Sequence, residues 1–263
     1  MPPESGITDA HCHLDILTEL EKKIDNARKY GINQFVTSAL NPESVKKSFG
    51  LAGSFPKGTV SVTIGIDPIE AGKTPGYSGE MLGLIKENSG RICGIGEIGL
   101  DYSPLVKPEE REVQMKAFLA AISLANELKL PVTVHSRSAG KYALETLLAN
   151  LNPEIPALMH AFDGRASYAI EAISKKKNLF FSIPPSVARK ENVQKANLVE
   201  ALPLERLLLE SDSPSLAPVP GEENEPANID LTIFTICEIR GVERETLVSQ
   251  VGRNWKEFSR NGN

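Results

Sequence analysis

Short apolar runs of strand length alternate along this chain with longer stretches that have helical spacing. Eight such runs can be counted, at residues 7–11, 34–40, 59–66, 91–98, 130–136, 156–162, 179–183 and 206–211. Strand–helix repeats of about thirty residues have the size and rhythm of a (β/α)8 TIM barrel. An open, doubly wound sheet is the competing architecture. A barrel carries its chemistry at the C-terminal ends of its strands, so the positions of the reactive side chains test the barrel interpretation.

The segment between the fourth and fifth runs predicts a helix. Within 108–130, a proline and two acids stand at the start, as a helix N-terminus favours. One face of this helix is expected to carry Met115, Phe118, Leu119, Ile122 and Ala125. A helix is also expected after the third run, although the segment "DPIEAGKTPGYSG" at 67–79 is loop-like in composition.

The chain is expected to form one domain, 1–263, because its longest irregular segment, 213–228, lies too near the end to separate two domains. No signal peptide is recognised at the start, and no apolar window is long enough to span a membrane. The three cysteines, Cys12, Cys93 and Cys237, are scattered, which indicates a reducing compartment and small apolar roles in the core. We therefore expect an intracellular protein, cytoplasmic or nuclear, with no membrane association.

All four histidines of the chain stand at or near the ends of predicted strands. His11 and His13 leave the first strand two positions apart, so their side chains can share one face of that strand. Two acids in apolar contexts join them after the fourth and eighth runs. The complete candidate set is His11, His13, Glu97, His135, His160 and Asp212.

Imidazoles with carboxylates, and without paired thiolates, are suited to a divalent ion such as zinc, manganese, cobalt or magnesium. Six ligands exceed the need of one catalytic ion and favour a two-metal site. Each residue alone also has a structural interpretation: a hydrogen-bonded core histidine, or a salt-bridge partner for Glu97. Asp9 and Asp15 could orient a histidine or serve as caps and turn residues. The glycines of "GIGEIG" are expected to allow close backbone approach around Glu97.

The blocks "DAHCHLD", "GIGEIGLDY", "VTVHSR", "MHAFDG", "LLLESDSP" and "NEPAN", in this order, resemble the signatures of the TatD family of metal-dependent deoxyribonucleases, within the amidohydrolase-like barrels. "HSRSAG", "HAFDGRAS" and "FSIPPS" resemble its eukaryotic branch of putative deoxyribonucleases. The resemblance runs from about residue 7 to about residue 258. It implies a (β/α)8 barrel that hydrolyses phosphodiester bonds in DNA, commonly as a 3′–5′ exonuclease and sometimes at abasic sites.

The resemblance also implies a ligand assignment for two divalent ions. One ion would take His11, His13 and Asp212, the other would take His135 and His160, and Glu97 would bridge them. Two positions depart from the family pattern. Asp67 stands where many relatives have a site histidine, and Glu223 replaces an arginine. An anion at Asp67 could repel a phosphate, serve as a ligand, or only cap the turn before Pro68.

A net charge of −5 gives no general attraction for nucleic acid, so a phosphodiester must be held by a local positive site. Two divalent ions would provide one, and Arg137, Lys141 and Arg165 could contact flanking phosphates or form surface ion pairs. A hydroxide bridging the metals would attack phosphorus, with Asp212 taking or orienting the proton. The catalytic assignments are therefore Asp212 and Glu97, with Asp67, Arg137 and Arg165 as substrate contacts.

DNA is the expected substrate, and no obligate protein partner is inferred. Three other functions stay open. The same metal site could hydrolyse a small ester, lactone, amide or phosphoester, because a fold does not fix a substrate. It could deacylate an aminoacyl-tRNA, or it could bind metal within an interaction protein that has no turnover.

Overall fold

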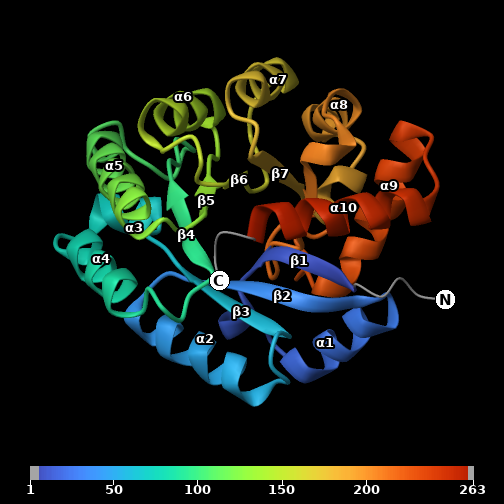
Figure 1. Cartoon of the computed structure of the whole chain (residues 1–263), viewed down its shortest axis with the longest axis horizontal. Helices are drawn as coiled ribbons and strands as arrows, with labels where there is room; N and C mark the ends of the chain where they lie inside the picture. The colour runs from blue at the N-terminus through green and yellow to red at the C-terminus, as the bar shows by residue number, and fades with distance from the viewer. Residues whose placement is uncertain (1–5, 260–263) are drawn as a thin grey trace.

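In the computed structural model, which describes residues 6–259, eight parallel strands form one sheet in the order of the sequence (Figure 1). All eight predicted runs coincide with strands, so the predicted (β/α)8 TIM barrel is confirmed. The strands are β1 (Ile7–Cys12), β2 (Ile32–Ala39), β3 (Val60–Ile64), β4 (Gly94–Gly99), β5 (Val132–His135), β6 (Ala157–Met159), β7 (Leu179–Ile183) and β8 (Leu207–Leu209). The expectation that the chain has no signal peptide was based on its first residues, and residues 1–5 of these lie outside the described range.

The first and last strands meet through backbone hydrogen bonds just beyond their ends. The amide of Asp212 donates to the carbonyl of His11 at 2.9 Å, and the amide of His13 donates to the carbonyl of Ser213 at 2.8 Å. The carboxylate of Asp9 adds to this seam by accepting the Ser211 amide at 2.8 Å. Asp9 therefore ties β1 to the segment after β8, and its carboxylate does not contact an imidazole through any hydrogen bond found in residues 6–259.

Helices surround the barrel, as Figure 1 shows. They are α1 (Leu20–Lys29), α2 (Pro42–Ser54), α3 (Pro68–Lys73), α4 (Tyr77–Glu87), α5 (Glu110–Leu128), α6 (Gly140–Asn150), α7 (Ala166–Lys175), α8 (Val193–Ala201), α9 (Ile229–Arg240) and α10 (Arg244–Ser259). Among residues 6–259, none of these helices combines the length and apolarity needed to cross a bilayer.

Two local expectations were wrong in part. A helix does follow the third run, but it begins within the loop-like segment 67–79, because Asp67 caps α3 by accepting the Glu70 amide and Pro68 occupies the first turn. On α5, Leu119 is 37% exposed, while Gln114 is buried. The predicted helix is otherwise confirmed as α5, with Phe118, Ile122 and Ala125 buried. The side-chain oxygen of Gln114 accepts the Asp101 amide at 3.0 Å, a contact that apolar spacing does not reveal.

A small apolar cluster lies below the C-terminal ends of four strands. It consists of Ala10, Leu158, Phe180 and Leu208, packed with Phe258 of α10. Because strand side chains alternate, the residues two positions beyond Leu158 and Leu208, His160 and Glu210, continue on the same face. The polar side chains at the strand ends therefore lie next to this packed apolar cluster inside the barrel.

Candidate metal centre

The six predicted ligands converge at the C-terminal ends of the strands. His11 lies in β1 and His13 just after it, Glu97 in β4, and His135 ends β5. His160 follows β6 directly, and Asp212 lies three residues after β8. Three groups of these side chains could each hold a metal ion: His11 with His13 and Glu97; Glu97 with His135 and His160; and His11 with His160 and Asp212.

Glu97 occupies the centre of this cluster. Its Oε2 atom lies 3.4 Å from His11 Nε2, 3.5 Å from His135 Nδ1 and 2.5 Å from His160 Nε2. Its other oxygen, Oε1, lies 4.0 Å from His13 Nε2. The backbone approaches closely here, as expected for "GIGEIG": a Cβ on Gly65 would overlap the Glu97 backbone, and Gly99 has a φ of +145°.

Asp212 lies beside His11 and His13, the two histidines that Glu97 also approaches. Its Oδ1 atom lies 3.5 Å from His11 Nε2 and 3.6 Å from His13 Nε2. His11 Nε2 and Glu97 Oε2 are fully buried but have no hydrogen bond of good geometry. Buried polar atoms that lack well-formed hydrogen bonds are costly, so the convergence of these two atoms fits a divalent ion between them.

Contacts behind the histidines fix which ring nitrogen faces the centre. His13 Nδ1 donates to the carbonyl of Ser38 at 3.2 Å, which leaves Nε2 toward Asp212. His135 Nε2 donates to Asp101 Oδ2 at 3.2 Å, which leaves Nδ1 toward Glu97. Such carboxylate–histidine contacts orient metal ligands and raise their basicity.

Charge within the cluster shifts the pKa values of its members. Burial and the nearby His160 lower the pKa of His11 to about 4, so this imidazole is neutral at pH 7. Burial alone would lower the pKa of His13 and His135, but hydrogen bonds to Asp212 and Asp101 and the charge of Glu97 raise them to about 9 and about 10. Burial opposes ionisation of Glu97 as well, yet His160, His11 and His135 hold its pKa well below the usual range. The raised pKa values of His13 and His135 thus reflect the negative charge of Glu97, Asp212 and Asp101 around them.

Sequence reasoning missed two acids beside the cluster, Asp101 and Glu210. Asp101 is 1% exposed and also accepts the Ser103 amide. Glu210 is fully buried, accepts from the Ser182 hydroxyl at 2.6 Å, and lies 3.7 Å behind His160 Nδ1. Both stand inside the quoted blocks "GLDY" and "LLLESDSP", but nothing in their spacing says which histidine they face.

Asp67 satisfies the capping interpretation, since its Oδ1 accepts the Glu70 amide at 2.8 Å. Burial raises its pKa, the negative charge of Glu97 adds to the rise, and the charge of His135 opposes it. The carboxylate is therefore electrostatically close to the cluster, although it belongs to none of the three ligand groups found in residues 6–259. Glu223, the other departure, pairs with Lys23 at 2.8 Å and accepts from Thr18.

The three basic residues that were expected to contact phosphates lie in different places. Arg137 follows β5, is exposed, and lines a cleft of about 410 Å³ together with His135, His160 and Asp212. Arg165 is exposed at the start of α7 and is not part of that lining. Lys141 lies 3.7 Å from Glu145 on the same helix. Contact of Arg137 or Arg165 with substrate stays a prediction.

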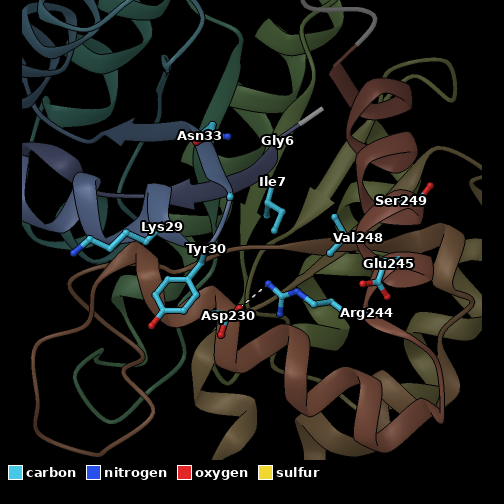
Figure 2. Close-up of a pocket in the computed structure, with 11 residues that line it drawn as sticks. Gly6, Ile7, Lys29, Tyr30, Asn33, Asp230, Arg244, Glu245, Val248 and Ser249 are labelled. Atoms are coloured by element: carbon cyan, nitrogen blue, oxygen red, sulfur yellow. Dashed lines mark ion pairs between the residues drawn. The ribbon is translucent and has the colours of Figure 1, made fainter. Parts of the chain in front are cut away.

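A larger cavity of about 690 Å³ lies at the opposite, N-terminal end of the barrel, between the start of β1 and α10 (Figure 2). Its lining includes the ion pair of Arg244 and Asp230, at 2.6 Å, and none of the six cluster residues. Volume therefore does not locate the reactive centre in this molecule. The chemistry of the side chains does, and it points to the smaller cleft.

Comparison with known proteins agrees with this geometry. The family model "TatD related DNase" matches residues 8–260. Deoxyribonuclease TATDN3 of Homo sapiens is 34% identical, over 95% of this chain and 93% of its own length. The uncharacterized metal-dependent hydrolase YabD of Bacillus subtilis is 29% identical, over 96% of this chain and 98% of its own length.

Among solved structures, the TatD homologue YJJV of Escherichia coli superposes with a TM-score of 0.85 at 22% identity, covering 96% of this chain and 97% of its own. That likeness concerns the barrel fold. The family match and the human relative extend over nearly the whole sequence, and the range of the family match contains all six residues of the histidine–carboxylate cluster. This chain therefore belongs to the family of TatD-related DNases.

Proposed function

We propose that this protein is a divalent-metal-dependent deoxyribonuclease that hydrolyses phosphodiester bonds in DNA, by 3′–5′ exonucleolytic cleavage, cleavage at abasic sites, or both. The observation that carries the proposal is the convergence of four imidazoles on Glu97 and Asp212 at the barrel mouth, where His11 Nε2 and Glu97 Oε2 are buried without a hydrogen bond of good geometry. Family membership supports the same reaction class, hydrolysis of an ester bond. The free cysteines favour a reducing, intracellular setting.

The donor set fits two ions that share a carboxylate. His11, His13 and Asp212 would hold one ion, His135 and His160 the other, and Glu97 would contribute to both. Nitrogen and carboxylate oxygen donors suit zinc, manganese or magnesium. Bound there, divalent ions supply Lewis acidity that stabilises charge on phosphate oxygens and favours ionisation of water near neutral pH.

The remaining steps belong to the chain itself. Asp101 and the Ser38 carbonyl hold His135 and His13 in the tautomers that aim at the centre. Asp212 stands at the edge of the cluster, 8% exposed and within the lining of the cleft. From there its carboxylate accepts the proton of the water that attacks phosphorus. Arg137 offers its guanidinium to a phosphate in the same cleft.

The test is an assay of the metal-reconstituted protein with zinc, manganese and magnesium in turn. Substrates are 3′-labelled single-stranded DNA, a duplex with one abasic site, an aryl ester and an aminoacyl-tRNA. Release of mononucleotides or cleavage at the abasic site supports the proposal. Turnover of the ester or the aminoacyl-tRNA alone would instead favour the alternative of a small-ester hydrolase or a deacylase, which the carboxylate of Asp67 near the cluster makes worth testing.

A further inference from the structure

The cleft that opens beside the metal centre extends well beyond the six ligands. One wall carries His135, His160 and Asp212, and the other is built by the segment after β7 and the start of α8. That second wall contributes Ser186, Arg189, Asn192 and Lys195. A volume of about 410 Å³ falls in the range of small-molecule sites, about 300–1,000 Å³, so the cleft can hold more than one phosphate group.

Two side chains of this cleft, Ser186 and Arg137, have hydrogen-bond donors that no acceptor within the described residues satisfies. The hydroxyl of Ser186 is buried, at 1% exposure, and has no hydrogen-bond partner. Within the described residues, the Arg137 guanidinium forms no ion pair or hydrogen bond either. A buried hydroxyl without a partner is costly, which points to a ligand that supplies an acceptor.

Other charged groups of the cleft are held by the protein. Arg189 donates from Nε and Nη2 to the carbonyl of Ala217 at 2.9 and 2.5 Å. Lys195 Nζ donates to the carbonyls of Ala161 and Phe162 at 2.6 and 2.9 Å. The carboxylate of Asp163 accepts the Ser138 amide at 2.6 Å. These contacts set the shape of the cleft and place two cations in its wall.

Charge around the cluster is therefore uneven. Asp67 and Asp101 lie on the side of β3 and β4, where an anion would be repelled. Arg137, Arg189 and Lys195 lie on the side of β5 to β8. The carboxylates of Asp163 and Asp212 line the same cleft, so a phosphate is favoured close to Arg137, which forms no ion pair within the described residues.

From these observations we infer that the cleft binds a second phosphate of the nucleic-acid strand, adjacent to the one that is hydrolysed, through Arg137 and the hydroxyl of Ser186. This inference rests on the proposed nuclease function and narrows its substrate to chains with consecutive phosphates. Arg189 and Lys195 are positioning residues in it, because their hydrogen bonds hold the loops after β8 and β6.

The first arm of the test compares three synthetic substrates with the metal-loaded protein: the dinucleotide dTpdT, the same with a 5′-phosphate, and the same with a 3′-phosphate. The diester bond is identical in all three. A second phosphate on the correct side is expected to raise kcat/KM by about tenfold or more, mainly through KM. Whether the 5′-phosphate or the 3′-phosphate raises kcat/KM shows on which side of the scissile bond the cleft lies.

The variants are Arg137→Ala and Ser186→Ala. For each variant, the ratio of kcat/KM for the preferred phosphorylated dinucleotide to kcat/KM for dTpdT should fall to near one. Lys57→Ala is the matched control, since this exposed lysine lies between α2 and β3 at the other end of the barrel. It removes one cation without touching the cleft and should preserve the wild-type ratio.

The second arm needs no metal and no turnover. Thymidine 5′-monophosphate is titrated into chelator-treated protein by calorimetry, and saturable binding weakened about fivefold or more by either variant is expected. Equal kcat/KM for all three dinucleotides, or variants that slow every substrate equally, would overturn the inference while leaving the nuclease proposal in place. If neither a dinucleotide nor the abasic duplex is hydrolysed with any metal, the nuclease proposal fails, and nucleotide binding unaffected by the variants would then refute the cleft assignment as well.

Discussion

Glu97 Oε2 lies 2.5 Å from His160 Nε2, and the same oxygen is within 3.5 Å of His11 and His135. One carboxylate thus reaches histidines that come from three different strands. Removing it should disturb both halves of the cluster. We therefore expect Glu97→Ala to reduce hydrolysis more than His13→Ala, because His13 serves one half only. Steady-state rates at saturating metal, with circular dichroism to verify folding, would check this, and near wild-type turnover by a folded Glu97→Ala protein would show that the bridging assignment is wrong.

Metal content is the most direct prediction. Metal-replete protein should carry about two divalent ions per chain, since six donors exceed the three or four that one ion takes. Chelation should abolish hydrolysis, and the added metal should restore it. Elemental analysis of the purified, dialysed protein gives the stoichiometry. Full activity with one ion or fewer would contradict the two-ion assignment.

Asp101 allows a test of a residue that orients the predicted ligand His135 without itself being a predicted ligand. Asp101→Asn keeps the size of the side chain but removes the charge that holds His135 Nε2–H. Losses of such outer contacts typically cost about 10–100-fold in metal affinity or activity. We expect a loss in that range, measured by competition with a metal-binding dye. Asp230→Asn, at the far end of the barrel beside Arg244, is the control and should leave metal affinity unchanged.

The pH dependence of metal uptake has a defined sign. At pH 7 the metal-free protein carries protons on His13 and His135, whose pKa values are about 9 and about 10. Metal can bind these imidazoles only after they lose their protons. Affinity should therefore rise with pH toward about pH 9–10, and binding at pH 7 should release protons into the buffer. His11, with a pKa of about 4, should contribute nothing above pH 6. Calorimetry in buffers of different ionisation enthalpy counts the protons, and a pH-independent affinity would contradict the protonation pattern.

Asp67→His changes both a cap and a charge. Loss of the hydrogen bond to the Glu70 amide should lower the free energy of unfolding by about 0.5–2 kcal/mol. Removal of a negative charge near the phosphate should raise nuclease efficiency at low substrate concentration, by an amount that shrinks as salt screens the repulsion. Denaturant melts and kcat/KM at two salt concentrations separate the effects. A fall in both activity and metal content would instead identify Asp67 as a ligand.

The sequence was sufficient for the barrel and for the six cluster residues because both depend on short-range patterns. Apolar runs mark strands, and histidines at the ends of parallel strands must meet at one edge of the sheet. A capping role for Asp67 was among the expectations, but the glycines and the second proline of 67–79 favoured a loop, so the helix that Asp67 caps was not placed there. Leu119 was placed on the buried face of α5 and Gln114 was not, because apolar spacing does not reveal the hydrogen bond between Gln114 and Asp101.

Partners of single polar atoms could not be predicted in this way. Asp101 contacts a histidine 34 positions away, and the Asp9 carboxylate contacts Ser211 at a separation of 202 positions. Both contacts depend on strand register and on the path of loops. The same is true of Ser186, which is an ordinary hydroxyl in the sequence and becomes distinctive only because the fold buries it without a partner.

The backbone hydrogen bonds between β1 and the segment after β8 imply an order in which the cluster assembles during folding. His11 and His13 emerge early in synthesis, but Asp212 reaches them only when the chain after β8 has docked onto β1. A partly folded or truncated chain would therefore hold histidines and a carboxylate that are not yet assembled, and would leave nucleic acid intact. Ions that bind the assembled cluster favour the closed barrel over open forms by mass action. Closure of the barrel and assembly of the histidine–carboxylate cluster are then a single event, because the same backbone hydrogen bonds that join β1 to the segment after β8 bring Asp212 beside His11.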